Sequence, residues 1–522
     1  MESTLIDNHG IEAQSPLPTP GQWGKEVIKQ DEIDKYLVDG KDFIDEKRIL
    51  NHLEQNQQPD KQRIRDIMQK SLDIERLDAD ETAALIHVTD ADLWQEMYET
   101  GLKVKQRVYD NRIVFFAPLY CGNLCINNCA YCGFRHENKS EKRRVLSMQE
   151  IEAETKAVIS KGHKRMIAVY GEHPTTDVDY MVDSIKTMYG VKGKARNGYS
   201  AIRRVNVNAA PMSIADLKKL WQVGIGTYQV FQETYHKPTY YQVHPSGPKA
   251  NYRWRLYALH RAMDAGIDDL AIGALFGLAD WRFEVMGLLY HAIDLEKQFD
   301  IGPHTISFPR LTPAGGSTLS THSPYRVDDD TFKKLVTIIR LSVPYTGLII
   351  TARENPELKK EVIKVGCTQT DASTKIGIGG YTEALKELKK IQNKDKDQDE
   401  TKQQFRLGDT RSLDAVIREL AEMGMITSFC TAGYRCGRTG DKIMGLLKNC
   451  VEGKFCKLNA VLTFREYLDD YALEETRKIG EKLIEKEMAE IKSMPFFQKG
   501  KLLQTFESYY RKVANGERDI YI

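Results

Sequence analysis

The sequence predicts an α/β protein built on a (β/α)8 barrel, and two observations support this fold class. Eight short apolar runs with the composition of strands follow one another along the chain, and amphipathic helical segments separate most of them. Strands that alternate with helices form a parallel sheet, and eight such units close into a barrel. The eight strands are expected at 112–118, 165–171, 203–209, 226–233, 269–278, 304–311, 347–353 and about 374–381.

The remaining sequence flanks this barrel, which we place at 111–385. Residues 1–24 are polar and contain three prolines, which predicts a mobile arm. Residues 25–110 carry apolar positions at helical spacing and predict a helical region. A charged, low-complexity run at 386–405 is expected to be a solvated linker. Beyond it, 406–522 should form a mainly helical carboxyl-terminal domain.

Composition excludes several classes of function. The chain of 522 residues has 75 basic and 74 acidic residues, so it has no charge excess that would favour nucleic acid or an anionic membrane. No apolar run approaches the roughly eighteen residues of a transmembrane helix, and the first residues lack a signal-peptide core. Nine cysteines in tight groups favour metal ligation in a reducing compartment over disulfides. We therefore expect a cytoplasmic enzyme.

Three of the cysteines form the most informative motif of the chain. Cys125, Cys129 and Cys132 have the spacing C-x3-C-x2-C, and Tyr131 precedes the last of them. Three thiolates can hold three irons of a [4Fe–4S] cube and leave the fourth iron open to a small chelating molecule. A zinc site would need a second pair of ligands at short spacing, and none follows. Because the motif follows the first strand directly, the cluster should lie at the carboxyl end of the barrel, where active sites form.

Polar residues late in the other apolar runs are further candidates for the site. Asn206 and Asn208 alternate with valines and therefore share one face of their strand. Arg353 is the best candidate for pairing a carboxylate, because the guanidinium fork matches it bidentately. The alternative for each residue is a structural one, either a hydrogen-bonded core amide or an ion pair at the rim. The remaining candidates are Glu172, which could hold an ammonium group, Gln232, Glu233, His304 and Arg310.

The cysteine motif resembles the signature of radical S-adenosylmethionine (SAM) enzymes. The resemblance implies that Cys125, Cys129 and Cys132 hold a [4Fe–4S] cluster whose open iron binds SAM, and that Tyr131 contacts the adenine. Electron transfer from the cluster then cleaves SAM to methionine and a 5′-deoxyadenosyl radical. On this basis we assign Tyr131, Glu172, Asn206, Asn208 and Gln232 to cofactor binding, and Glu233, Arg310 and Arg353 to catalysis.

Longer segments resemble a narrower family, the aromatic amino acid lyases of this superfamily. The similarity spans about 80–480 and is greatest to the HydG-type maturases of [FeFe]-hydrogenase, followed by the ThiH-type tyrosine lyases (2-iminoacetate synthases). It implies cleavage of the Cα–Cβ bond of L-tyrosine to p-cresol and dehydroglycine, with a reducing donor such as ferredoxin or flavodoxin. In HydG-type enzymes dehydroglycine then yields CO and cyanide at a second cluster, which implies other hydrogenase maturases as partners. The segments are 117–134, 203–211, 224–249, 304–311, 343–354, 429–442 and 458–472.

One part of the sequence departs from this family. HydG-type enzymes hold the second cluster with C-x2-C-x22-C, and here Cys430 and Cys456 occupy the outer positions while the middle position is Gly433. Cys436 and Cys450 lie nearby. Three interpretations remain: Cys436 replaces the missing ligand, the cluster is lost and the lyase stops at dehydroglycine, or the four cysteines are plain thiols.

His304, Cys121 and Cys367 also need an assignment. His304 matches the family's ligand to a labile iron beside the second cluster, and its alternative role is that of a core or rim histidine. Cys121 and Cys367 are expected to be small apolar core residues. The function is thus either a HydG-type tyrosine lyase of hydrogenase maturation, a lyase without the CO and cyanide step, or a non-catalytic iron–cyanide/CO scaffold.

Overall fold

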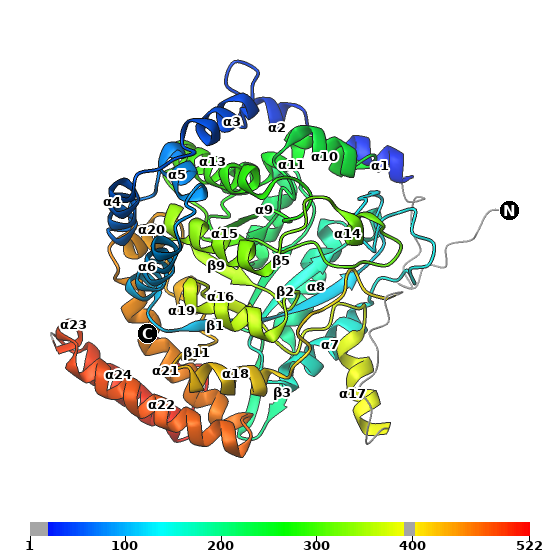
Figure 1. Ribbon diagram of the computed structural model, residues 1–522. Coiled ribbons are helices and arrows are strands. Elements are labelled where there is room, and N and C mark those ends of the chain that lie inside the picture. Colours follow the sequence, from blue (N-terminus) through cyan, green and yellow to red (C-terminus); the bar gives the residue numbers. More distant parts are fainter. Residues whose placement is uncertain (1–18, 391–401, 499) are drawn as a thin grey trace.

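A computed structural model describes residues 19–390, 402–498 and 500–522, and a closed barrel of eight parallel strands lies at its centre (Figure 1). Each strand pairs with the next along the chain, and the last pairs with the first, so the sheet is closed. The predicted (β/α)8 barrel is therefore confirmed. The strands are β1 (Ile113–Gly122), β2 (Arg165–Tyr170), β5 (Arg204–Asn208), β6 (Tyr228–Gln229), β7 (Leu270–Gly273), β8 (Thr305–Ser307), β9 (Gly347–Ile350) and β10 (Gln369–Asp371).

Helices between the strands cover the outside of the barrel. Most of the longer ones begin at a Ser, Asp or Asn whose side chain accepts a hydrogen bond from the first turn, as Ser147 and Asp328 do. Their buried faces pack on the strands. They are α7 (Met148–Ser160), α8 (Val178–Gly190), α9 (Ile214–Val223), α10 (Lys237–Val243), α11 (Tyr252–Leu256), α12 (Ala258–Asp264), α13 (Trp281–Phe299), α14 (Leu319–His322), α15 (Asp329–Ser342), α16 (Pro356–Val365) and α17 (Gly380–Lys390).

The predicted position of the eighth strand is wrong. The strand forms at Gln369–Asp371, whereas 374–381 is a turn that leads into α17. Glycine-rich segments favour turns, and Gly379 has a φ of 79° that a strand does not allow. The real strand has only three residues, which is too short to show a period. A small antiparallel hairpin of β3 (Lys192–Ala195) and β4 (Gly198–Ala201) is not foreseen either, because its sequence is polar.

The predicted helical region precedes the barrel. Its longest helix packs against α15 and α4, and so joins the outer layer of the barrel. Of the predicted arm, residues 1–18 lie outside the described part of the chain, and the first helix begins at Pro20. The helices are α1 (Pro20–Val27), α2 (Asp31–Asp34), α3 (Glu46–Gln55), α4 (Lys61–Leu72), α5 (Ala79–Ile86) and α6 (Ala91–Tyr109).

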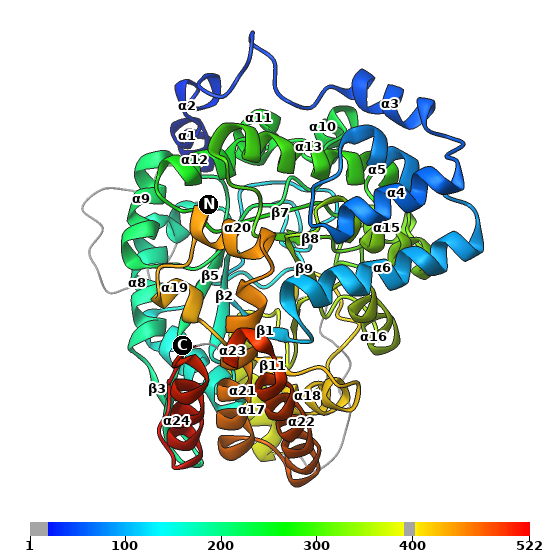
Figure 2. The ribbon, with the colours of Figure 1, turned by 90° about the vertical axis from the view of Figure 1, so that its left-hand side faces the viewer.

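The carboxyl-terminal region is mainly helical and attaches to the amino-terminal end of the barrel. Its single short strand pairs with the first residues of β1, Thr427 opposite Ile113. In Figure 2 its last long helices lie below the barrel, and α1, α2 and α3 lie above it. Within the predicted linker, 391–401 lies outside the described residues. The elements are α18 (Leu413–Glu422), β11 (Thr427–Ser428), α19 (Ala432–Arg435), α20 (Gly440–Lys448), α21 (Glu452–Asp470), α22 (Glu474–Ser493), α23 (Pro495–Gln498) and α24 (Leu502–Ala514).

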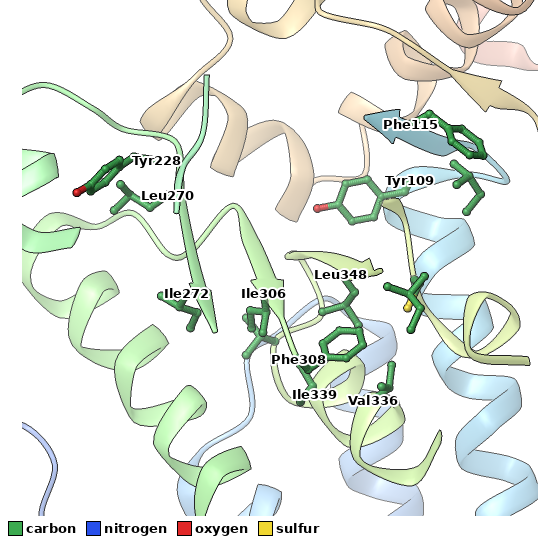
Figure 3. Close-up of a cluster of buried hydrophobic side chains, with 14 of the residues drawn as sticks. Tyr109, Phe115, Tyr228, Leu270, Ile272, Ile306, Phe308, Val336, Ile339 and Leu348 are labelled. Carbon is green, nitrogen blue, oxygen red and sulfur yellow. The ribbon is translucent and has the colours of Figure 1, made fainter. Parts of the chain in front are cut away.

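Alternation along the strands separates the outer core from the bore of the barrel. Phe115, Ile306 and Leu348 belong to the large core between strands and helices, part of which Figure 3 shows. Their neighbours Phe116 and Ile349 point the other way and form a small apolar cluster with Ile167 inside the barrel. None of the described helices is long and apolar enough to cross a bilayer.

Candidate active site

A cavity of about 230 Å³ lies at the carboxyl end of the barrel strands. It is the position where (β/α)8 barrels carry their active sites. The loop after β1 contributes the predicted cysteines, and the ends of the other strands contribute polar side chains. Predicted site residues that line it are Cys125, Cys129, Tyr131, Cys132, Glu172, Asn208, Glu233 and Arg353.

The three predicted cluster ligands face this one cavity as free thiols. Cys129 is buried, and Cys125 and Cys132 are half-buried. Burial raises the pKa of Cys129 to about 12, and nearby Lys249 opposes this shift. In the described part of the chain no three His, Cys, Asp or Glu side chains converge on one metal ion. A [4Fe–4S] cube does not need such convergence, because each thiolate binds a different iron. The cysteine loop therefore fits a cubane, which would also stabilise the thiolates.

Neighbouring residues hold the cysteine loop in place. The Tyr131 hydroxyl lies 2.8 Å from His244 Nε2, and the Ala130 N–H donates to the Val243 carbonyl at 2.9 Å. Gly171 approaches the loop so closely that a Cβ there would lie 2.2 Å from the Leu124 carbonyl oxygen. The loop is thus fixed by α10 on one side and by the end of β2 on the other.

Glu172 provides a free acceptor beside the cysteines. Its Oε2 accepts a hydrogen bond from Asn127 Nδ2 at 2.5 Å, while its buried Oε1 has no partner. Burial raises the pKa of this carboxyl group. Because buried polar atoms are normally hydrogen-bonded, the unpartnered oxygen suits an ammonium group of a ligand. That is the role expected for Glu172 from its place after β2.

Glu233 is held between two cations that sequence reasoning missed. It accepts hydrogen bonds from Lys249 Nζ at 2.8 Å and from Arg255 Nη2 at 3.3 Å. Burial would raise the pKa of Glu233, but Lys249 and Arg255 hold it below its usual value. Glu233 also has a φ of 71°, a strained conformation for a non-glycine residue that is typical of functional sites. Lys249 precedes α11 and Arg255 lies within it, so neither is at the end of a strand. A search for polar residues late in the strands therefore could not find them.

The two arginines predicted to act in catalysis differ in their surroundings. Arg353 lines the cavity, donates to Thr312 Oγ1 at 2.9 Å and stacks on Phe405 at 3.3 Å. Among the described carboxylates, none forms an ion pair with it. Arg310 does not line the cavity and pairs with Glu354 and Asp329 instead. Arg353 is therefore free to bind a carboxylate of a ligand, whereas Arg310 closes the rim.

The predicted amides are only partly brought to the cavity. Asn208 lines it, but Asn206 lies deeper in the barrel, where its Oδ1 accepts the N–H of Thr227 at 3.1 Å. Gln232 is buried without lining the cavity, and neither atom of its amide has a hydrogen-bond partner. The shared face of Asn206 and Asn208 thus gives one lining residue, because the two differ in depth.

Part of the predicted linker borders the site. Gln404 Nε2 lies 3.6 Å from Cys132 Sγ, and its Oε1 accepts the hydroxyl of Tyr120 at 3.0 Å. Phe405 covers the guanidinium of Arg353. The charged composition of this segment gave no signal for these contacts, which depend on two uncharged side chains.

A second cavity of about 70 Å³ lies at the opposite, amino-terminal end of the barrel. The residues that start several strands line one side of it, and α19, α20 and α21 line the other. Cys430, Cys456 and His304 line this cavity, together with Gly433 at the middle position of the predicted ligand set. Cys436, at the end of α19, is exposed, and neither it nor Cys450 contributes to the lining.

The residues present at this second cavity do not fit a cubane of the HydG type. Two thiols face it where the predicted cluster needs three, because Gly433 has no side chain and Cys436 points elsewhere. Cys121 and Cys367 belong to the main hydrophobic core and line neither cavity. The cysteine loop after β1, at the upper, carboxyl end of the barrel, is therefore the candidate for metal binding.

Comparison with known proteins agrees with this geometry. The radical SAM superfamily matches residues 119–284, and the Biotin and Thiamin Synthesis associated domain matches residues 307–426. The 2-iminoacetate synthase of Salmonella typhimurium is 31% identical over 339 residues, covering 64% of this chain and 85% of that protein.

Solved structures extend the similarity through the carboxyl-terminal region. A crystal structure of HydG, a maturase of the [FeFe]-hydrogenase, is 43% identical with a TM-score of 0.84, covering 92% of this chain and 100% of that one. HydG from Carboxydothermus hydrogenoformans is 36% identical with a TM-score of 0.72, covering 92% and 99%. The chain belongs to the radical SAM superfamily, in the family that contains HydG and 2-iminoacetate synthase.

Proposed function

We propose that this protein is a radical SAM lyase that cleaves the Cα–Cβ bond of L-tyrosine to p-cresol and dehydroglycine. The observation that carries the proposal is the shared cavity of the cysteine loop and Arg353, a half-buried arginine that no described carboxylate pairs. Membership of the superfamily implies a [4Fe–4S] cluster and SAM, which together supply a hydrogen-abstracting radical when bound. The relatives named 2-iminoacetate synthase and HydG support tyrosine as the substrate.

Each group at the cavity then has a distinct task. Cys125, Cys129 and Cys132 hold the cluster, and the free Oε1 of Glu172 binds the ammonium group of SAM. Arg353 binds the carboxylate of tyrosine, which orients its amino group for hydrogen abstraction. Positioning of this kind supplies much of the rate of such reactions, because the reacting atoms are already close.

The Glu233 ion pairs stand beside this substrate position. Glu233 keeps Lys249 and Arg255 pointing to the cavity, where Lys249 lies 5.5 Å above the ring of Tyr131. These two cations suit the carboxylate of SAM.

A second candidate function places the lyase in [FeFe]-hydrogenase maturation, with CO and cyanide made from dehydroglycine. The match to HydG along 100% of that chain favours it. The missing third thiol at the second cavity opposes the CO and cyanide step. We propose a ferredoxin- or flavodoxin-type electron donor for either function, and other hydrogenase maturases as partners for the second.

Anaerobic incubation of the reconstituted protein with SAM, dithionite and L-tyrosine tests both candidates. The lyase should release p-cresol and 5′-deoxyadenosine, and absence of both would leave only a non-catalytic iron–cyanide/CO scaffold. Trapping with deoxyhaemoglobin then measures CO. If p-cresol forms without CO, the protein is a lyase that stops at dehydroglycine. If CO forms as well, the result supports the maturase function.

A further inference from the structure

The second cavity is surrounded by buried polar atoms that have no partner. Proteins normally satisfy more than nine in ten such groups, so a cluster of exceptions around one cavity points to a ligand. Both donors and acceptors occur among them. The atoms are Arg112 Nε, Arg165 Nε, Asp269 Oδ1 and His304 Nδ1, all on residues that line the cavity.

The charges at this cavity are not balanced. Arg438 lies 3.3 Å from Glu452, which compensates its charge, and Arg165 donates to the Cys430 carbonyl at 2.9 Å. Arg112 is 9% exposed and makes no hydrogen bond or ion pair with any residue of the described ranges. Asp269 is the other carboxylate of the lining. Three guanidinium groups thus face two carboxylates.

An unpaired buried guanidinium is costly, because its desolvation is not repaid by a partner. The Arg112 guanidinium lies 5.1 Å from the ring of Tyr109, a weak contact, and the nearby carboxylate of Glu452, which also favours its charge, is already paired with Arg438. A guanidinium presents a planar fork of donors that matches oxyanions such as carboxylate and phosphate. The lining therefore offers what a small anion needs.

The same lining is poorly suited to the second cluster that the HydG relationship implies. Guanidinium groups are not metal ligands, and the third cysteine is absent at Gly433. We infer that in this chain the second cavity binds a small oxyanion, held by Arg112 and Arg165, and is not the seat of a second cubane. The volume of about 70 Å³ limits the ligand to the size of acetate or inorganic phosphate.

Isothermal titration calorimetry tests this site on the full chain with the upper cluster reconstituted and SAM in excess, so that Lys249 and Arg255 are already occupied. Arg353→Gln serves as the background, so that the unpaired guanidinium of the upper cavity does not contribute. Sodium acetate and inorganic phosphate are titrated separately, with the ionic strength matched by chloride. One of them should bind at a single site, and the anion that binds identifies the ligand class.

Adding Arg112→Gln should weaken that binding roughly tenfold or more, because a charge-assisted hydrogen bond is lost. Arg435→Gln is the matched control, since Arg435 on neighbouring α19 pairs with Asp519 and does not line the cavity. The anion should bind the variant with Arg353→Gln and Arg435→Gln as tightly as it binds the variant with Arg353→Gln alone. If Arg112→Gln does not fold, as judged by circular dichroism, Arg165→Gln replaces it with the same expectation.

Three results would overturn the inference. The first is that neither anion binds, and the second is that binding is unchanged by the loss of Arg112 or Arg165. The third is the presence of a second cluster. The last is measured as iron and sulfide per chain. About eight irons that fall to about four in Cys430→Ser would show a second cubane at this cavity. None of these results depends on the lyase activity, so the site and the proposed reaction can fail separately.

Discussion

The two ends of the barrel carry two cavities whose polar side chains differ in kind. At the carboxyl end three thiols share the lining with an unpaired Arg353 and a free oxygen of Glu172. At the amino-terminal end two thiols share it with three guanidinium groups. The upper set comes mainly from loops that follow strands. The lower set is shared between Arg112 and Arg165, at the start of barrel strands, and the carboxyl-terminal segment that carries Cys430, Arg438 and Cys456. One fold can therefore keep one site complete while the chemistry of the other changes, because each site belongs to different segments.

The sharpest way to break this comparison is to remove one thiol at each end. Cys129→Ala should lower 5′-deoxyadenosine formation by at least about a hundredfold, because the cubane needs all three thiolates. Cys456→Ala should leave the rate within about twofold, since the sites are distant and share no residues. Anaerobic assays with SAM and dithionite measure both. An equal loss in the two variants would show that the ends are coupled.

The amino-terminal end also depends on ion pairs that join it to α21. Glu466 lies 2.7 Å from Lys164 Nζ and 2.5 Å from Arg203 Nη2, and despite burial these cations hold its pKa at about 2. A pKa below the ordinary value of 4.5 means that the ionised form stabilises the fold above about pH 4.5. This stabilisation, up to about 3 kcal/mol, is lost as the pH falls from 4.5 toward 2.

Acid unfolding followed by circular dichroism measures this effect. Glu466→Gln should be less stable than the wild type at neutral pH, and the difference should shrink as the pH approaches 2. Glu474→Gln, at an exposed carboxylate that pairs with Lys478 on α22, is the matched control and should follow the wild type. A difference that stays constant with pH would rule out ionisation of Glu466 as the cause.

A third change tests the role of the unpaired arginine at the carboxyl end. Arg353→Gln should raise the KM for tyrosine about ten- to hundredfold, because the substrate carboxylate loses its charged partner. Cleavage of SAM without substrate should persist. Arg310→Gln, at the rim, should lower the thermal midpoint and leave KM nearly unchanged. A KM that is the same in Arg353→Gln as in the wild type would remove Arg353 from the substrate site.

The smallest expected effect on stability comes from restoring the missing thiol. A Cβ at Gly433 would meet only the Arg438 carbonyl oxygen, at 3.4 Å, which is an ordinary contact. Gly433→Cys should therefore change the free energy of unfolding by no more than about 1 kcal/mol. Gly433→Ala controls for the added volume. After reconstitution, iron per chain should rise in the cysteine variant alone, and an unchanged iron content would show that three thiols are not enough at this end.

Sequence reasoning recovered the barrel and the cysteine loop because both leave local signals. Strand periodicity and C-x3-C-x2-C spacing are visible within a few residues. It missed the true eighth strand, which is only three residues long, and it missed Lys249 and Arg255, which reach the cavity from a connection before and within α11. Such placements arise from tertiary packing, for which a single sequence carries no period.

The second cavity shows a similar limit of prediction from the sequence. Spacing singled out Cys430 and Cys456, which line this cavity, but it gave Cys436 the same weight. Cys436 follows the short helix α19 and is exposed, so it does not face the cavity. Arg112 directly precedes β1, at the end of the barrel opposite the predicted active site, so the search for polar residues late in strands did not mark it as a possible ligand group.

The space beside Gly433 has a consequence for how this protein can change over generations. Glycine codons ending in U or C become cysteine codons by a single base substitution, and the backbone here already accepts a side chain. Where the codon for Gly433 ends in U or C, one base substitution would therefore convert the two-thiol form into the three-thiol form without passing through an unfolded protein. The amino-terminal end of the barrel would be a place where lineages gain and lose a metal centre while the radical chemistry at the other end is inherited unchanged.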